Sequence, residues 1–332
     1  MTASLEFLAP WLTHLSPGGP VAAGPLTLIP LLGPERLPPI STLRPQRAND
    51  EVQVREVSES GVVGRVLVVN RSPLPLLLLD GEELVGAKQN RVVNASTLVG
   101  PGVALEVPVS CCERGRWRDV GSGFRSVGRS MPLSMKAAKH ARVSQSLRQR
   151  RGFDADQGAV WRDVDGYLRG RGVRSRTDAL SEAFDTDFEA LDRLRQQLMN
   201  RGPGDGEIGV AFALQGRLLG IELFGSHNLY AQAYERLLHA CFAEALGVEV
   251  RGVEATLEPL RLVHSVLSST PSSQPSPGLG EDHRFACALG TGFLLSWDGA
   301  PIHAAVFAPS PRWSGPTGRG RGFERGGAGA GR

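Results

Sequence analysis

Residues 81–91 carry an unusual density of side chains that can do chemistry. Their sequence is Gly-Glu-Glu-Leu-Val-Gly-Ala-Lys-Gln-Asn-Arg, which supplies two acids, two bases and two amides. They lie between an apolar run at 76–79 and a strand-like alternation at 92–99. An ordinary turn uses Gly, Pro, Asn, Asp and Ser for backbone reasons, and paired glutamates with Lys, Gln and Arg meet no such need. The segment therefore predicts a ligand site. The alternative is the polar end of a hairpin whose charges lie in water.

The side chains of this segment suit a phosphate-bearing, nucleotide-like ligand. Lys88 and Arg91 are phosphate partners by type, the first as a point charge and the second as a planar fork. The amides can pair with base edges, and either glutamate can accept ribose hydroxyls or ligate a hard cation. Because an extended chain alternates its faces, the set shares one face only if the backbone bends, which Gly86 permits. The candidate ligand-binding residues here are Glu82, Glu83, Lys88, Gln89, Asn90 and Arg91.

Three residues outside the segment are ambiguous. Glu113 follows the strand-like residues 104–109 and is counted with the site. Trp117 can stack on a base or pack in the core, and we predict core packing. Glu222 lies between apolar residues of a predicted strand and is a further candidate. Facing inward it would need a partner, since an unpaired buried carboxylate is costly, whereas facing outward it would be an ordinary surface charge.

The sequence leaves enzyme activity undecided, and no catalytic residue is assigned. Cys111 as a nucleophile would need a depressed pKa and a nearby base, and a buried cysteine is the default interpretation. The four cysteines are too scattered for a disulfide framework, and neither they nor the seven histidines show metal-ligand spacing. No P-loop or dinucleotide glycine motif occurs between a strand and a helix. No metal site is expected, and the cofactor is unknown.

Two strings are specific in combination. They are Leu-Asp-Gly-Glu-Glu-Leu-Val-Gly-Ala-Lys-Gln-Asn-Arg at 79–91 and Pro-Val-Ser-Cys-Cys-Glu-Arg-Gly-Arg-Trp at 108–117. With shorter stretches at 157–164, 220–225 and 299–307, they resemble the ARPP domain family of the first type, over roughly residues 20–308. That name stands for ARG and rhodanese-phosphatase-superfamily-associated protein. The resemblance implies a role near NAD and ADP-ribose metabolism in bacterial conflict or repair systems, without an established reaction.

Charge is distributed unevenly along a chain whose net charge is only +3. Residues 114–151, which we call the basic belt, hold eleven Lys or Arg and a single acid, Asp119. Such a belt can attract a polyanion, or it can be a solvated loop and helix face. No run approaches the ~20 apolar residues of a membrane-spanning helix, and residues 1–10 lack the basic start of a secretory signal. We therefore expect a cytoplasmic location and no membrane partner.

The elements that position these residues begin with short strands. The first 110 residues contain six or seven of them without a helical period, which is typical of an antiparallel sandwich or open barrel. The clearest helix is expected over residues 177–198, with Thr177 as its N-cap and an apolar stripe that includes Phe184, Phe188 and Leu191.

The predicted fold class is α+β, with a mostly antiparallel, β-sandwich-like N-terminal half and a mixed α+β C-terminal half. The expected ranges are 1–113 for the β-rich half, 114–152 for a basic connector, 153–308 for the α+β half and 309–332 for a disordered Gly/Arg tail.

The sequence thus predicts recognition of a nucleotide-derived small molecule, related to NAD or ADP-ribose, by a polar pocket built on residues 82–91 and 113. Processing of that molecule stays open. The alternative is a non-catalytic module that binds nucleic acid, weakly, or a protein partner through the basic belt. In a third interpretation the polar segment only fixes the sheet. The oligomeric state is unknown.

Overall fold

The computed structural model describes residues 5–35, 37–44, 51–118, 121, 123–186, 188–246, 248 and 257–309, except the side chains of 186–191 and 194. It confirms the predicted α+β, β-rich class. The helices are α1 (Leu8–Thr13), α2 (Leu133–Arg148), α3 (Gln157–Gly170), α4 (Leu180–Thr186), α5 (Phe188–Arg201), α6 (His227–Ala245) and α7 (Pro259–Leu267). The predicted disordered tail lies outside the described residues from position 310 onward.

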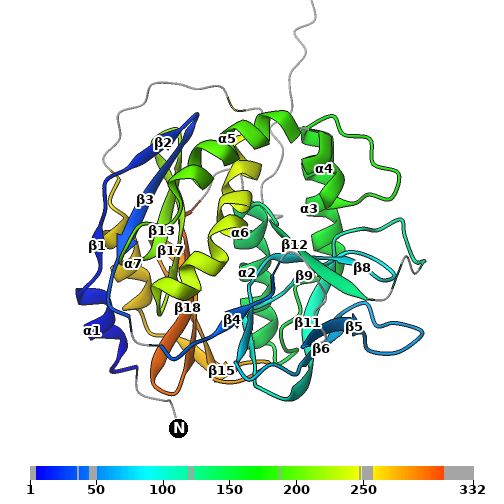
Figure 1. Cartoon of the computed structure of the whole chain (residues 1–332), viewed down its shortest axis with the longest axis horizontal. Coiled ribbons are helices and arrows are strands. Elements are labelled where there is room, and N and C mark those ends of the chain that lie inside the picture. The colour runs from blue at the N-terminus through cyan, green and yellow to red at the C-terminus, as the bar shows by residue number, and fades with distance from the viewer. Residues whose placement is uncertain are drawn as a thin grey trace, which may run out of the picture.

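A nine-stranded antiparallel sheet forms one layer of the molecule (Figure 1). Its order is β1-β3-β13-β14-β18-β17-β16-β15, with β2 paired to β3. The strands are β1 (Ser16–Pro17), β2 (Val21–Ala23), β3 (Leu26–Leu32), β13 (Glu207–Leu214), β14 (Arg217–Phe224), β15 (Ser272–Pro275), β16 (Glu281–Cys287), β17 (Gly290–Trp297) and β18 (Ala300–Phe307). Helices α1 and α7 pack on one face through a shared apolar cluster, and α6 packs on the other. Because both faces are covered, every residue of β13 is buried.

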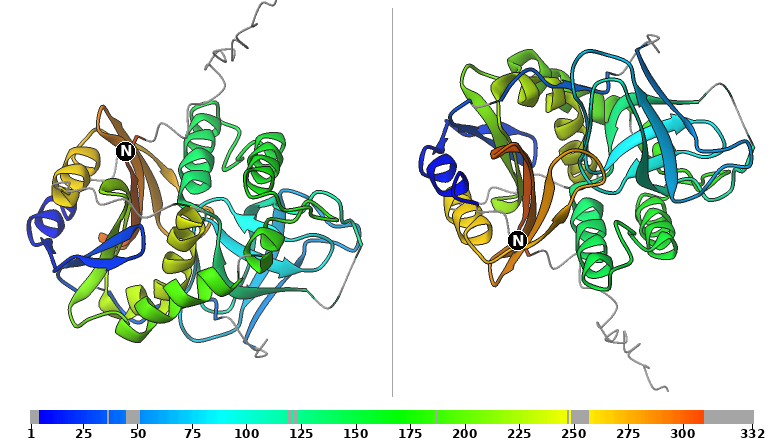
Figure 2. Two further views of the ribbon diagram at one scale, coloured as in Figure 1. Left: turned by 90° about the horizontal axis from the view of Figure 1, so that it is seen from above. Right: turned by 90° about the horizontal axis from the view of Figure 1, so that it is seen from below.

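The second layer is a closed six-stranded barrel, seen beside the sheet in Figure 2. Its strands follow the order β11-β6-β5-β12-β8-β9. They are β5 (Val52–Glu56), β6 (Arg65–Asn70), β8 (Glu82–Gly86), β9 (Arg91–Val93), β11 (Val103–Cys111) and β12 (Phe124–Ser130). Alternating apolar residues fill the interior, among them Val66, Val68, Val107 and Val109. The sandwich-like arrangement expected for the N-terminal half is therefore a barrel, whose closure leaves no free strand edge.

A small sheet and a long helix join the two layers. The small sheet has the order β10-β7-β4, from β4 (Ser41–Thr42), β7 (Leu76–Leu78) and β10 (Thr97–Val99). Helix α6 starts where the Ser226 side chain accepts a hydrogen bond from the Leu229 N–H, an N-cap. It contacts β12 of the barrel and β13 of the large sheet, so it is the central helix of the molecule.

The predicted helix over 177–198 is wrong in its start. Helices α4 and α5 occupy this region, and residue 187 between them lies outside the described residues. The first cannot begin at Thr177 because Asp178 has a left-handed backbone, with φ 51°. Phe184 is buried as expected, whereas the side chains of Phe188 and Leu191 lie outside the description.

The large sheet draws strands from both ends of the sequence. β3 pairs with β13, so residues 26–32 lie in the same sheet as residues 207–214. The predicted ranges 1–113 and 153–308 remain a prediction about domains, but their strands are interleaved in this sheet.

Candidate functional site

The β8–β9 turn bends sharply, as the sequence suggested. Gly86 has φ 130° and Ala87 has φ 41°, both in the region that disfavours ordinary side chains. A Cβ at Gly86 would collide with the carbonyl oxygen of Gly123, which the neighbouring strand brings close. The bend allows residues 88–91 to turn back at one end of the barrel.

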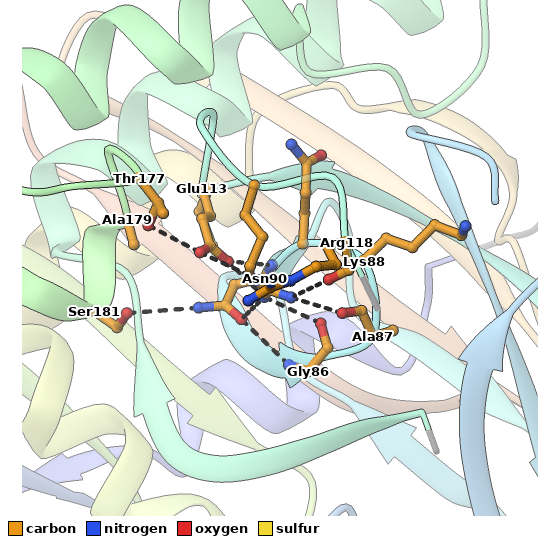
Figure 3. A network of polar contacts seen from close by, with 12 residues as sticks. Gly86, Ala87, Lys88, Asn90, Glu113, Arg118, Thr177, Ala179 and Ser181 are labelled. Carbon is orange, nitrogen blue, oxygen red and sulfur yellow. Dashed lines mark hydrogen bonds and ion pairs between the residues drawn. The ribbon is translucent and has the colours of Figure 1, made fainter. Parts of the chain in front are cut away.

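Asn90 and Glu113 hold this turn in place (Figure 3). The Asn90 N–H donates to Glu113 Oε2 at 3.1 Å, and Asn90 Oδ1 accepts from the Gly86 N–H at 3.2 Å. Arg116 donates to both carboxylate oxygens of Glu113, at 2.8 Å and 2.6 Å. Thr177 adds a hydroxyl donor at 2.9 Å. Glu113 is therefore fully engaged in positioning the turn.

The pKa of Glu113 reflects these partners. Burial acts to raise the pKa, but the hydrogen bonds from Arg116, the Asn90 N–H and Thr177 outweigh it and lower the pKa below its ordinary value. The carboxylate thus stays charged, which keeps the Arg116 fork and the turn together.

Arg91 is buried at the end of the barrel, and part of its guanidinium forms no hydrogen bond with the described residues. Its Nη1 donates to Gln89 Oε1 at 3.2 Å and to Cys111 Sγ at 2.7 Å, and its Nη2 lies 3.6 Å from Glu56 Oε1. Within the part of the chain that the structure describes, no acceptor forms a hydrogen bond with Nε or Nη2. A fully buried cation with two nitrogens that form no hydrogen bond is unusual, because the hydrogen bonds lost with its hydration are not replaced.

Cys111 is a buried thiol. Its Sγ donates to Gln89 Oε1 at 2.9 Å, and burial raises the pKa to about 11 despite the nearby Arg91 charge. A raised pKa keeps the sulfur protonated at neutral pH, whereas a nucleophilic cysteine needs the thiolate form. This geometry therefore does not support Cys111 as a nucleophile.

Trp117 corrects another expectation. It is 48% exposed and does not pack in the core. Its ring lies over two cations, with the Arg91 Cζ 5.7 Å and the Lys88 Nζ 5.9 Å from the ring centroid. The Trp117 ring is therefore held by cation–π attraction to Lys88 and Arg91, and not by the core contacts that were expected.

Two exposed valines lie in the β5–β6 loop at the same end of the barrel. Val62 and Val63 are 41% and 37% exposed, and the Val63 carbonyl lies 4.0 Å from Cys111 Sγ. Lys88 lies against Gly61 of this loop, and its N–H donates to Glu56 Oε1. We call this surface the barrel mouth, formed by Glu56, Val62, Val63, Lys88, Gln89, Arg91, Cys111 and Trp117.

The two glutamates of the segment lie away from the mouth. Glu82 accepts hydrogen bonds from Ser126 at 2.7 Å and from Arg236 of α6 at 2.9 Å, so it ties the barrel to the central helix. Glu83 is fully buried, with Oε1 3.8 Å from Cys112 Sγ and Oε2 without a hydrogen bond in the described structure. Desolvation raises the pKa of Glu83 to about 7.

Glu222 lies in neither of these two regions. Of the two orientations considered from the sequence, inward with a partner or outward as a surface charge, the inward one is correct. It forms an ion pair with Lys136 of α2, and its Oε2 lies 2.7 Å from His303 Nε2. His303 Nδ1 lies 2.7 Å from Ser96 Oγ. These side chains are all at most 2% exposed.

A second ion pair lies next to the first. Lys139, one helical turn from Lys136, pairs with Asp80 and donates to the Asn94 carbonyl at 2.9 Å. We call the whole group the buried charge cluster, formed by Asp80, Ser96, Lys136, Lys139, Glu222 and His303. It joins the barrel side, α2 and the large sheet.

Sequence reasoning missed most of the buried charge cluster, although a signal was present. The chain has 37 Lys and Arg residues, of which only Lys88, Lys136 and Lys139 are lysines. All three contribute to the barrel mouth or the cluster. The rarity of lysine in an arginine-rich chain could therefore have pointed to the barrel mouth and to the buried charge cluster.

The basic belt is not one continuous charged surface. Lys136 and Lys139 are buried in the cluster, and Arg116 is bound to Glu113. Arg129 and Arg142 form ion pairs with Asp185 and Asp163. About half of the eleven basic residues counted from the sequence are therefore buried or paired with an acid within the protein.

No group of three or more His, Cys, Asp and Glu side chains is arranged to hold a metal ion in the described ranges. Among the same residues, no helix is long and apolar enough to cross a membrane.

Comparison with known proteins gives one informative result. Neither the curated proteins nor the solved structures contain a match to the chain. A family model matches residues 14–307, and it describes the ARG and Rhodanese-Phosphatase-superfamily-associated Protein domain. The strings behind the earlier resemblance meet at the two places described above: Asp80, Glu222 and His303 in the buried charge cluster, Arg91 and Trp117 at the barrel mouth. With nearly its whole folded length matched, the chain belongs to this ARPP domain family of the first type.

Proposed function

We propose that the barrel mouth binds an anionic, ring-bearing small molecule derived from a nucleotide, of the NAD or ADP-ribose kind. The observation that carries the proposal is the buried Arg91 guanidinium beside the exposed Trp117 ring, with Nε and Nη2 free of hydrogen bonds in the described structure. A phosphate oxygen would satisfy these nitrogens, because arginine pairs with phosphate through two parallel N–H groups.

Lys88, Trp117 and the two exposed valines have distinct roles in this proposal. Lys88 supplies a second, mobile positive charge for a diphosphate. Trp117 stacks on the ring of the ligand, and the two exposed valines extend the apolar edge. Since Arg91 is fully buried in the free protein, the Trp117 ring must turn aside for a phosphate to reach it. Glu113 and Asn90 hold the turn and do not touch the ligand.

The proposal is limited to binding in the cytoplasm. No reaction is assigned to the mouth, since Cys111 is a protonated thiol and Glu113 is a fully bonded carboxylate. Nucleic-acid binding through the basic belt is the second candidate, and the pairing of its charges within the protein counts against it.

The test is calorimetric titration of the full chain with NAD, ADP-ribose and AMP, repeated with Lys88→Ala and Trp117→Ala. Each substitution should weaken binding about tenfold, the first by removing a phosphate contact and the second by removing stacking. Arg261→Ala is the matched control, since Arg261 is an exposed arginine of α7 paired with Glu258. Its affinity should equal that of the unmodified chain.

Two results would reject the proposal. One is the absence of binding with a Kd below about 1 mM for all three ligands. The other is binding that Lys88→Ala and Trp117→Ala leave unchanged. If a DNA duplex instead bound tightly near ~0.15 M salt, the basic belt would become the favoured site, because non-specific phosphate contacts are screened there.

A further inference from the structure

A cavity of about 510 Å³ lies away from both the barrel mouth and the buried charge cluster. Its walls come from the first turns of α2, the β13–β14 hairpin, the end of α6 and the ends of β16 to β18. This volume is within the range of small-molecule sites, which span roughly 300–1,000 Å³. The lining combines apolar side chains with a few polar groups, as such sites usually do.

Glu244 is the acidic residue of the cavity lining. The residue is 8% exposed, and its Oε1 accepts a hydrogen bond from the Ser134 N–H at 2.6 Å. Pro132 precedes α2 without a side-chain cap, so Glu244 takes the role of cap for this helix. Among the described residues, no basic side chain forms a salt bridge with Glu244, although the residue is largely buried and lines the cavity. A carboxylate without a basic partner favours a cationic ligand, which can form a charge-assisted hydrogen bond with it.

The other side chains leave that charge available. Arg217 also lines the cavity, but its Nη2 donates to the Pro309 carbonyl at 2.8 Å. Leu133, Ala137, Leu219 and Phe307 provide apolar walls. The site therefore combines a carboxylate, an arginine that is bonded to a backbone carbonyl, and surfaces suited to a hydrocarbon or aromatic body.

We propose that this cavity binds a small primary amine whose ammonium group pairs with Glu244 and whose apolar body packs against Leu219 and Phe307. The ammonium would donate to Oε2, while Oε1 keeps its bond to α2. This ligand is opposite in charge to the one expected at the barrel mouth. The two proposals are independent, so either can fail without the other.

Cys287 provides a local reporter for occupancy. It lines the cavity and is the one cysteine of the four that is not fully buried. Alkylation by iodoacetamide should therefore occur at Cys287 first, because Cys111, Cys112 and Cys241 are buried thiols whose pKa values burial raises. A bound molecule should slow the reaction by covering the sulfur.

The experiment compares three probes of similar size and different charge: phenethylamine, 2-phenylethanol and 3-phenylpropionate. We expect phenethylamine to protect Cys287 and raise the thermal midpoint at concentrations about tenfold lower than the alcohol, with no effect of the acid, because a charge-assisted hydrogen bond is stronger than a neutral one. Equal effects of the amine and the acid, or no effect of the amine on either readout, would overturn the proposal.

Variants separate binding from folding. Glu244→Gln should abolish the preference for the amine, and Leu219→Trp should block all three probes by filling the space while leaving the cap on α2 intact. Glu235→Gln is the control, since Glu235 is an exposed glutamate on the same helix paired with Arg195. If amine protection survives both Glu244→Gln and Leu219→Trp, the site lies elsewhere and the proposal is wrong.

Discussion

The barrel mouth and the buried charge cluster both contain charged side chains, but they differ in how far their cations are hydrogen-bonded within the protein. In the cluster, Lys136 and Lys139 each have a carboxylate partner, and His303 has a partner at both ring nitrogens. At the mouth, Arg91 keeps two nitrogens without hydrogen bonds in the described structure, next to an exposed tryptophan. Each lysine of the cluster is hydrogen-bonded to a carboxylate, although Asp80 Oδ2 has no hydrogen bond in the described structure. A cation bonded to an anion within the protein indicates a structural role, whereas a cation with unused N–H groups indicates a place that a ligand can complete. Unused N–H groups on a cation therefore identify a candidate ligand site better than the number of charged residues does.

The largest effect should come from breaking a pair in the cluster. Glu222→Leu leaves the Lys136 ammonium buried without its anion, and we expect the free energy of unfolding to fall by about 3–5 kcal/mol. The double variant Lys136→Met/Glu222→Leu should recover much of this loss, because it removes both charges. Urea denaturation of the three proteins measures both effects. A single variant as stable as the parent would mean that the cluster does not hold the layers together.

Glu83 gives a prediction with a definite pH dependence. Its folded pKa of about 7 is above the ordinary value of 4.5, so the folded state binds more protons than the unfolded state between these values. The contribution of Glu83 to stability is therefore fully present below pH 4.5 and is lost as the pH rises to 7. Glu83→Gln should be more stable than the parent by about 1–3 kcal/mol at pH 8, and the difference should shrink toward pH 5.

Thermal denaturation of the parent and of Glu83→Gln across this pH range measures the effect. The difference between the two proteins isolates the residue from other titrating groups. A difference that stays constant from pH 5 to pH 8 would contradict a raised pKa at this position.

Arg91 tests the other side of the comparison. Replacing both members of a buried ion pair by neutral side chains of similar volume is often neutral, so the double variant Glu56→Gln/Arg91→Met should change the unfolding free energy by only about 1 kcal/mol. The same double variant should abolish binding at the barrel mouth. A loss of stability as large as that of Glu222→Leu would show that Arg91 is a structural residue and would weaken the proposed function.

Local patterns predicted much of the fold. The α+β class and the short antiparallel strands of the first 110 residues follow from apolar alternation and turn residues. The closure of the barrel and the β3–β13 pairing are not encoded in any local pattern, because they join residues far apart in the sequence. The start of the helix at Leu180 instead of after Thr177 depends on the left-handed Asp178, which an apolar stripe cannot reveal.

The candidate site was predicted in part. Residues 88–91 and Glu113 do meet, because the bend at Gly86 returns the chain toward the end of β11. Glu82, Glu83 and Glu222 have other partners, since alternate residues of β8 point to different faces and β14 belongs to another sheet. Trp117 looked like a core residue by type alone, and its two cations come from a strand and a turn whose proximity only the fold defines.

The smallest effect on stability is expected at Trp117, where binding and folding should separate most clearly. The ring is about half exposed and contacts the side chains of Lys88 and Arg91, so Trp117→Ala should change the unfolding free energy by no more than about 1 kcal/mol. Affinity for the nucleotide ligand should nevertheless fall, whereas Trp117→Phe should retain part of it because an aromatic face remains for stacking. Calorimetric titration of both variants distinguishes these outcomes. If alanine and phenylalanine weaken binding equally, stacking is not the contribution of this residue, and the mouth would recognise phosphate through its cations alone.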